Sequence, residues 1–145
     1  MSTATYELPE KIDAKEADYL YLKKSKIQGA GKGLFTMVPI YKNEIISIFK
    51  GEILSNKEAA QRAIKKQDAY FINMLNGSIL DSMTVDCFAK YANDANAFSS
   101  TKNNAHIALD ENNTICLVAT RNIKAGEEIY CSYGKKYWKN FLKNQ

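Results

Sequence analysis

Three short segments of this 145-residue chain carry residues that could bind a ligand or act in a reaction. GAGKGLF has a glycine at every second position from Gly29, which lets a backbone turn tightly and a ligand approach it closely. FAKYANDAN leads into Asn93 and Asp94, a pair that taken alone is ordinary turn chemistry. The third segment, IKAGEEIYCSYGKKYW, predicts a turn and then a strand, whose end would present the hydroxyl of Tyr133 to a cleft.

The glycine segment matches neither of two common nucleotide-binding motifs. It is not a P-loop, because Lys32 is followed by Gly33 and not by Ser or Thr. It is not a dinucleotide fingerprint, because its third glycine comes too early and no helix is predicted after it. Taken alone, the segment is equally consistent with a hairpin turn, and core packing is the favoured explanation of the aromatic residues in the third segment.

The cysteines and the single histidine argue against a disulfide framework and against a metal site. Cys87, Cys116 and Cys131 are odd in number and show no C-x-x-C spacing. A catalytic pair of His106 with Cys87 or Cys131 is formally available. However, Cys116 lies in an apolar run and no orienting carboxylate is evident near His106, so buried or incidental roles are favoured.

The charge of the chain is modest but uneven. The formal net charge is +4; five of the first 20 residues are acidic, and residues 131–145 contain four lysines and no acid. The apolar runs are far shorter than the roughly 20 residues of a membrane span, and the N-terminus lacks the apolar core of a secretory signal. These features predict a soluble intracellular protein with no membrane partner. The lysines are a weak signal for nucleic-acid binding.

The elements that must position these segments are mostly strands. Runs rich in strand-favouring residues, separated by Gly, Asn, Asp and Pro, predict strands near residues 19–25, 33–38, 44–49, 105–109, 114–121 and 127–133. One helix is predicted after Ser55, which forms a capping-box pattern with Glu58 and precedes an apolar side of Ala59, Ala60, Ala63 and Ile64. The polar stretch 93–104 predicts a loop. The sequence therefore predicts one mainly β domain.

The order and spacing of six segments resemble the SET-domain protein lysine methyltransferases. The segments are GKGLFT, FKGEIL, YFINML with ILDS, AKYAND with NAH, VATRNIKAGEEIYCSYG and YW. The likeness runs from about Leu20 to Trp138 and is most specific in the VATRNIKAGEEIYCSYG segment. It implies a β-clip fold of small sheets with a pseudoknot and one short inserted helix. It also implies an N-terminal extension at 1–18, a SET domain at 19–138 and a basic tail at 139–145.

The resemblance implies a binding site for S-adenosylmethionine. Gly31, Lys32 and Gly33 match the family's Gly-x-Gly loop, whose backbone holds the methionine part of this cofactor. Asn93 and Asp94 stand where the family usually has Asn-His, the pair that binds the cofactor's amine and adenine. Asp94 departs from that pattern, which puts the affinity for the cofactor in question.

The resemblance also implies the residues around the target lysine. Tyr133 matches the catalytic tyrosine, Tyr70 matches a tyrosine of the target-lysine channel, and Tyr137 and Trp138 match the aromatic pair closing over the channel and the adenine. Cys131 stands where the family's Phe or Tyr influences how many methyl groups are added. Its small side chain predicts that more than one can be added. A further departure, at position 49, puts phenylalanine where the family often has tyrosine.

Lysine chemistry gives a reason for this aromatic surrounding. A lysine side chain in water has a pKa near 10.4, so deprotonating it at about pH 7.4 costs roughly 4 kcal/mol. Burial of its stem among aromatic rings disfavours the charged form. Alignment of the neutral amine with the methyl carbon further lowers the barrier to methyl transfer. No metal is required for this chemistry. In this interpretation the hydroxyl of Tyr133 aligns the amine, and the proton leaves to water.

Three interpretations follow for the chain. The favoured one is a minimal lysine methyltransferase acting on a protein or peptide that presents a lysine, with a histone tail as the habitual family substrate. The second is a catalytically silent SET-like module that binds a peptide or partner. The third is a basic β domain that binds nucleic acid through its C-terminal lysines, which the lack of an aromatic platform pattern disfavours. The sequence leaves the oligomeric state open, and a dimer is conceivable.

Overall fold

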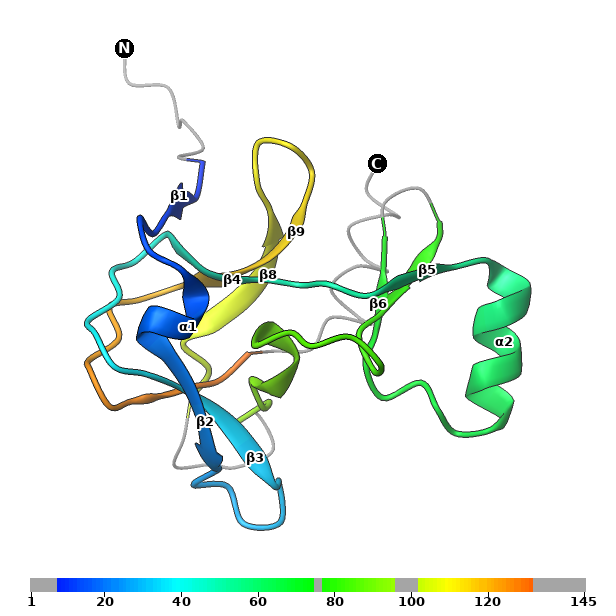
Figure 1. The fold of residues 1–145 in the computed structure, drawn as a ribbon, viewed down its shortest axis with the longest axis horizontal. Coiled ribbons are helices and arrows are strands. Elements are labelled where there is room, and N and C mark those ends of the chain that lie inside the picture. The colour runs from blue at the N-terminus through cyan, green and yellow to red at the C-terminus, as the bar shows by residue number, and fades with distance from the viewer. Residues whose placement is uncertain (1–7, 75–76, 96–101, 132–145) are drawn as a thin grey trace.

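The computed structural model describes residues 8–74, 77–95 and 102–131. Within these ranges the chain forms short strands with two α-helices and one 3-10 helix (Figure 1). The helices are α1 (Glu16–Tyr19), α2 (Asn56–Ile64) and the 3-10 helix η1 (Ala89–Tyr91). The strands are β1 (Glu10–Lys11), β2 (Leu20–Lys24), β3 (Lys32–Thr36), β4 (Glu44–Ile48), β5 (Glu52–Leu54), β6 (Phe71–Asn73), β7 (Ile79–Asp81), β8 (Ala105–Leu109), β9 (Ile115–Ala119) and β10 (Glu128–Ile129).

The strands assemble into three small sheets. Their orders are β1-β4-β9-β8, β10-β3-β2 and β5-β7-β6. In Figure 1 strands β5 and β6 extend with α2 to one end of the molecule, away from β2, β3, β8 and β9. The prediction of a mainly β fold of small sheets is therefore confirmed. The predicted pseudoknot also involves residues after Cys131, which lie outside the described residues.

Strand β9 shows why an almost continuous apolar run forms a strand here. All five of its residues are buried. Ile115, Leu117 and Ala119 face the main core, whereas Cys116 and Val118 belong to a second apolar cluster. Because side chains alternate between the two faces of a strand, burial on both faces requires apolar residues at every position.

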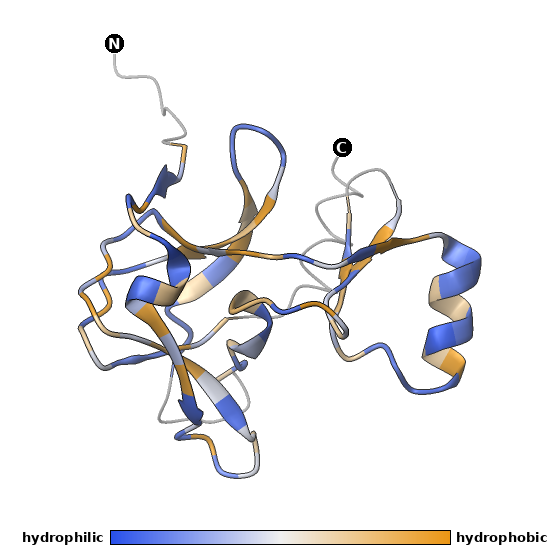
Figure 2. Ribbon diagram, in the orientation of Figure 1, coloured by the Kyte–Doolittle hydropathy of each residue, from blue (hydrophilic) through white to orange (hydrophobic). Residues whose placement is uncertain are grey.

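Helix α2 begins as its sequence predicts but packs differently from a typical amphipathic helix. The Ser55 hydroxyl accepts the Glu58 N–H, and the Glu58 side chain accepts the Ser55 N–H, which completes the predicted capping box. On the predicted apolar side, however, Ala59 is buried while Ile64 is 83% exposed. Hydrophilic residues cover most of the helix in Figure 2. Apolar burial alone therefore does not hold α2 in place.

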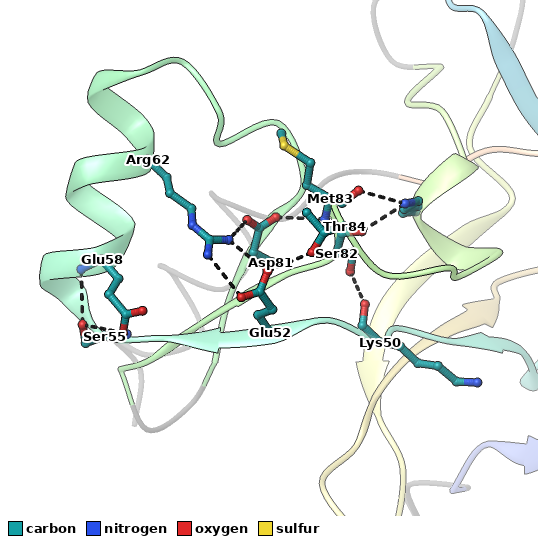
Figure 3. Close-up of polar contacts among 10 residues, drawn as sticks. Lys50, Glu52, Ser55, Glu58, Arg62, Asp81, Ser82, Met83 and Thr84 are labelled. Carbon is teal, nitrogen blue, oxygen red and sulfur yellow. Dashed lines mark hydrogen bonds and ion pairs between the residues drawn. The ribbon is translucent and has the colours of Figure 1, made fainter.

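A guanidinium and two carboxylates attach α2 to the neighbouring sheet (Figure 3). Arg62 Nη1 lies 2.7 Å from Asp81 Oδ2, and Arg62 Nη2 lies 3.2 Å from Glu52 Oε2. The side chain of Asp81 is 1% exposed, and its Oδ1 also accepts the Met83 N–H at 3.0 Å. Since Glu52 belongs to β5 and Asp81 to β7, the pair of contacts ties the helix to two strands.

The segment predicted as an N-terminal extension packs against β4. Strand β1 pairs with β4 in parallel, and the Glu16 carboxylate accepts the Ser47 hydroxyl and the Ile48 N–H. The Tyr19 hydroxyl donates to Ile46 O at 2.7 Å, and burial is the main cause that raises the pKa of this tyrosine.

No helix in the described ranges is long and apolar enough to cross a membrane.

Replacing Asp81 by asparagine will destabilise the protein. The amide has one acceptor oxygen for two donors, the Arg62 guanidinium and the Met83 N–H, so one of them would face an NH₂ group in a buried site. We therefore expect a loss of roughly 1–3 kcal/mol in the free energy of unfolding. The matched control is Glu52→Gln, which alters the exposed carboxylate on the same guanidinium. Urea unfolding measures both variants. Equal stability of Asp81→Asn and the unmodified protein would contradict the anchoring role of this carboxylate.

Candidate functional site

The glycine segment forms the turn between β2 and β3. The Ser25 N–H donates to Gly31 O at 2.8 Å, which closes the turn across residues 25–31. Gly31 has a φ of +72°, in the left-handed region that other residues rarely adopt. Glycine at this position is therefore needed for the backbone path.

Gly33 has a different structural reason to be glycine. A Cβ at this position would overlap Glu128 Oε2, so the absence of a side chain makes room for this carboxylate. Glu128 is 3% exposed, and it accepts hydrogen bonds from the Ser25 hydroxyl, the Lys26 N–H and the Tyr130 hydroxyl. Burial is the main cause that raises the pKa of Tyr130. The carboxylate thus contacts the glycine turn and the last described strand segment together.

The Asn-Asp segment lies between the glycine turn and the C-terminal strand. The Asn93 side chain donates from Nδ2 to Lys32 O at 3.1 Å, and the backbone carbonyl of Asn93 accepts the Cys131 N–H at 2.9 Å. Tyr130 O accepts the N–H groups of Asn104 and Ala105. Three segments that are distant in sequence therefore meet around Asn93.

A pocket of about 460 Å³ opens where these segments meet, and five predicted site residues line it. Gly31 and Lys32 belong to the glycine turn, and Tyr70 is the residue before β6. Asn93 and Asp94 belong to the segment after η1. Asp94 Oδ1 accepts a hydrogen bond from Asn103 Nδ2 at 3.1 Å. The structure thus brings together both predicted cofactor segments and the predicted channel tyrosine.

Lys90 is a pocket residue that the sequence alone does not indicate. Its ammonium lies 5.5 Å from the ring centroid of Tyr70 and 5.3 Å from that of Tyr91. It also donates to the carbonyl oxygens of Ser82, Met83 and Val85 at 3.0–3.3 Å. A cation held against aromatic faces is attracted to them, so Lys90 fixes two pocket rings relative to the turn after β7.

The turn after β7 is itself anchored. The Ser82 hydroxyl donates to Lys50 O at 2.6 Å, and the Ser82 N–H donates to Tyr70 O at 3.3 Å (Figure 3 shows the first contact). Asp81, immediately before this turn, is held by Arg62. Contacts from α2 to Asp81 and from this turn to Lys90 and Tyr70 therefore set one wall of the pocket.

Two predicted site residues in the described part of the chain do not line this pocket. Cys131 is fully buried in the main core, and burial raises the pKa of its thiol. Gly33 faces Glu128, as described above. Tyr133 and the pair of Tyr137 and Trp138 lie outside the described residues, so their roles stay predictions.

The described residues also form a larger depression of about 1090 Å³. It is formed by residues 11–17, the end of β4 and the chain around Cys87. None of the residues predicted to bind the cofactor or the target lysine lines this depression. Cys87, which belongs to the formal Cys-His alternative, does line it. Tyr91 lines both depressions, so they adjoin each other at η1. In the described ranges no group of three His, Cys, Asp or Glu residues is arranged to hold a metal ion.

The chain matches a known protein family over most of its length. The family model described as SET domain matches residues 31–134, most of the chain. This chain belongs to the SET-domain family. The match spans both predicted cofactor segments, the predicted channel residue Tyr70 and the segment that contains Tyr133.

Curated relatives and a solved structure agree with SET-domain membership. Histone-lysine N-methyltransferase mes-2 of Caenorhabditis elegans is 30% identical over 116 residues, which cover 78% of this chain and 15% of the relative. Histone-lysine N-methyltransferase EZH2 of Chaetomium thermophilum is 25% identical over 131 residues, or 83% of this chain and 8% of the relative. The solved structure of apo ctPRC2 with mutations in Ezh2 matches with a TM-score of 0.67 and 29% identity, over 79% of this chain and 15% of that chain.

These relatives are much longer than the present chain. The chain spans 15% of the length of mes-2 and 8% of the length of EZH2. The likeness therefore concerns the SET domain alone and not the remainder of these relatives.

Thiol labelling will test the buried position of Cys131. Burial raises the pKa of Cys131 and raises the pKa of Cys116 to about 12, so neither is an exposed thiolate. In the folded protein at about pH 8 we expect N-ethylmaleimide to modify the half-buried Cys87 first and to spare the other two. Mass spectrometry of peptides locates the label, and labelling in guanidinium gives the fully reactive control. Rapid labelling of Cys131 in the folded protein would contradict this placement.

Proposed function

We propose that this SET domain transfers a methyl group from S-adenosylmethionine to the side-chain amine of a protein lysine. The observation that carries the proposal is the pocket lined by Gly31, Lys32, Tyr70, Asn93 and Asp94. These residues come from three separate segments, and each belongs to the site that the sequence predicts. Ligand pockets typically have volumes of about 300–1,000 Å³, and this pocket lies in that range.

The chemistry of the pocket suits a polar cofactor. The turn at Gly31 exposes backbone groups without a side chain above them, and Asn93 is held by its bond to Lys32 O. When bound, S-adenosylmethionine would supply an electrophilic methyl group on a sulfonium. We propose Gly31, Lys32, Gly33, Asn93, Asp94 and Trp138 as the residues that hold this cofactor, with Gly33 acting through the backbone path.

The residues around the target amine would favour its neutral form. Tyr70 presents an aromatic wall, and the ammonium of Lys90 lies against the same ring. A neighbouring positive charge and an apolar wall both disfavour a second ammonium, which helps the substrate lysine lose its proton. The proposed role of the Tyr133 hydroxyl is to align the neutral amine, while the proton passes to water. Tyr137 is proposed to complete the substrate side. Cys131, which is buried in the main core, would influence the number of methyl groups only through its small volume.

The proposed substrate is a protein or peptide that presents a lysine, and histones are the first class to examine. The support is that the curated relatives named above are histone-lysine N-methyltransferases. We propose 19–138 as the SET domain, with residues 1–18 as an extension that contributes β1 and most of α1 to the body. The alternative, a silent SET module that binds a partner, is supported by Asp94 in place of the usual histidine, and the experiments below separate the two.

A large side chain at Ala69 will block the cofactor site. Ala69 is exposed and lines the pocket, so Ala69→Trp would fill the opening with little cost to folding. Isothermal titration with S-adenosylmethionine is expected to give binding for the unmodified chain and at least a tenfold weaker affinity for Ala69→Trp, the loss of about 1.4 kcal/mol of binding free energy. The matched control is Ala60→Trp on the exposed side of α2. Identical binding by all three proteins would exclude this pocket as the site.

Removal of the Tyr133 hydroxyl will separate binding from turnover. Since the hydroxyl is proposed to align the amine, Tyr133→Phe is expected to bind S-adenosylmethionine normally and to lose roughly a hundredfold or more in kcat. Tyr41→Phe serves as a control, because Tyr41 is exposed in the loop before β4. Both rates are measured by methyl transfer to histone and lysine-peptide mixtures. A near-normal rate for Tyr133→Phe would remove this residue from the mechanism.

A further inference from the structure

We propose that Glu128 is a positioning residue for the cofactor. This proposal rests on the proposed function of the pocket. Its buried carboxylate holds the turn of residues 25–33 in the conformation that presents Gly31 and Lys32 to the pocket. Glu128 itself does not line the pocket, so it acts through the turn. Sequence separation concealed this role, because Glu128 lies 102 residues beyond Lys26 in the chain.

Both carboxylate oxygens are engaged at the entry to the turn. Glu128 Oε2 accepts the Ser25 hydroxyl at 2.6 Å, and Oε1 accepts the Lys26 N–H at 2.8 Å. The same Ser25 Oγ accepts the Ile27 N–H at 3.1 Å. The carboxylate therefore fixes the first three residues of the turn, one of them through the serine hydroxyl.

The C-terminal end of the turn, at Gly33, packs against the same Glu128 carboxylate. Gly33 is packed so closely that a Cβ there would overlap Glu128 Oε2, and the Ser25 N–H donates to Gly31 O. A shift of the carboxylate would thus disturb both arms of the turn. Gly31 and Lys32, which line the pocket, lie between these fixed points.

The charge of Glu128 is balanced by neutral donors. Among the described residues no Lys, Arg or His forms an ion pair with it, and its third donor is the Tyr130 hydroxyl at 2.9 Å. Burying a carboxylate is costly unless hydrogen bonds compensate, and bonds to an ionised acceptor are about twice as strong as neutral ones. The turn therefore has a strong preference for the one conformation that supplies the donors from Ser25 and Lys26.

This arrangement prepares the turn before any cofactor arrives. A binding loop that is already ordered loses less conformational freedom on binding, so it binds its ligand with higher affinity. Loss of the Glu128 charge should then weaken cofactor binding more than it slows the chemical step at saturating cofactor.

The test compares Glu128→Gln with Glu16→Gln in the full chain. Gln at position 128 keeps the volume and can still accept the Lys26 N–H, but it loses the charge and leaves the Ser25 hydroxyl facing an amide. Glu16 is a matched control because its carboxylate also accepts a serine hydroxyl and a backbone N–H, from Ser47 and Ile48, on the α1 side of the body. Ser25→Ala, which removes one donor only, is a milder second variant.

Two measurements decide the outcome. Hydrogen exchange of the free protein is expected to be faster at residues 26–33 in Glu128→Gln and unchanged there in Glu16→Gln. Titration with S-adenosylmethionine is expected to give an affinity about tenfold weaker in Glu128→Gln, a loss that corresponds to one hydrogen bond to a charged group. The kcat at saturating cofactor is expected to stay within about threefold of the value for the unmodified chain.

The proposal is overturned if exchange at 26–33 is the same in Glu128→Gln and the unmodified chain. It is also overturned if both Gln variants lose the same affinity, which would indicate a general loss of stability. Failure of the unmodified chain to bind S-adenosylmethionine would instead refute the proposed function, and the exchange measurement would still decide whether Glu128 orders the turn.

Discussion

A carboxylate buried at Glu128 joins the glycine turn to strand β10 and so sets one wall of the pocket. A charge that is 3% exposed must be satisfied by protein donors, and those donors come from the turn at Ser25 and Lys26 and from Tyr130. Gly33 must lack a side chain to admit this group. Once Glu128 is in place, β10 lies beside β3, and the following residues reach Asn93 through the Cys131 N–H.

A second buried carboxylate, that of Asp81, positions another wall of the pocket. Asp81 binds Arg62 of α2 and the Met83 N–H, which fixes the turn whose carbonyls hold the Lys90 ammonium against Tyr70. The two carboxylates thus position the two walls separately, one through the glycine turn and one through the β5-β7-β6 sheet. Their geometry explains how a short chain with three small sheets can build a pocket from distant segments.

Sequence could predict the features that depend on neighbouring residues. The capping box of Ser55 and Glu58, the strands around Leu34 and Leu117, and the left-handed glycine turn follow from local chemistry or alternation of apolar residues. The three-residue strands β5, β6 and β7 carry too little pattern to be recognised without the family resemblance. The roles of Lys90 and Glu128 escape prediction because they depend on carbonyls, donors and rings brought together by the fold. The resemblance supplied Tyr70 and Asn93 for the site, whereas the partner of Gly33 became visible only in three dimensions.

The proposed activity of this SET domain is the transfer of a methyl group from S-adenosylmethionine to a lysine amine. The most direct measurement is incubation of the purified chain with cofactor carrying an isotope-labelled methyl group and with histones and lysine-bearing peptides, followed by mass spectrometry of the products. We expect labelled methyl groups on lysine side chains, with more than one on a single amine at long incubation. Binding of the cofactor without any labelled lysine in any substrate would contradict the claim and indicate a silent SET module.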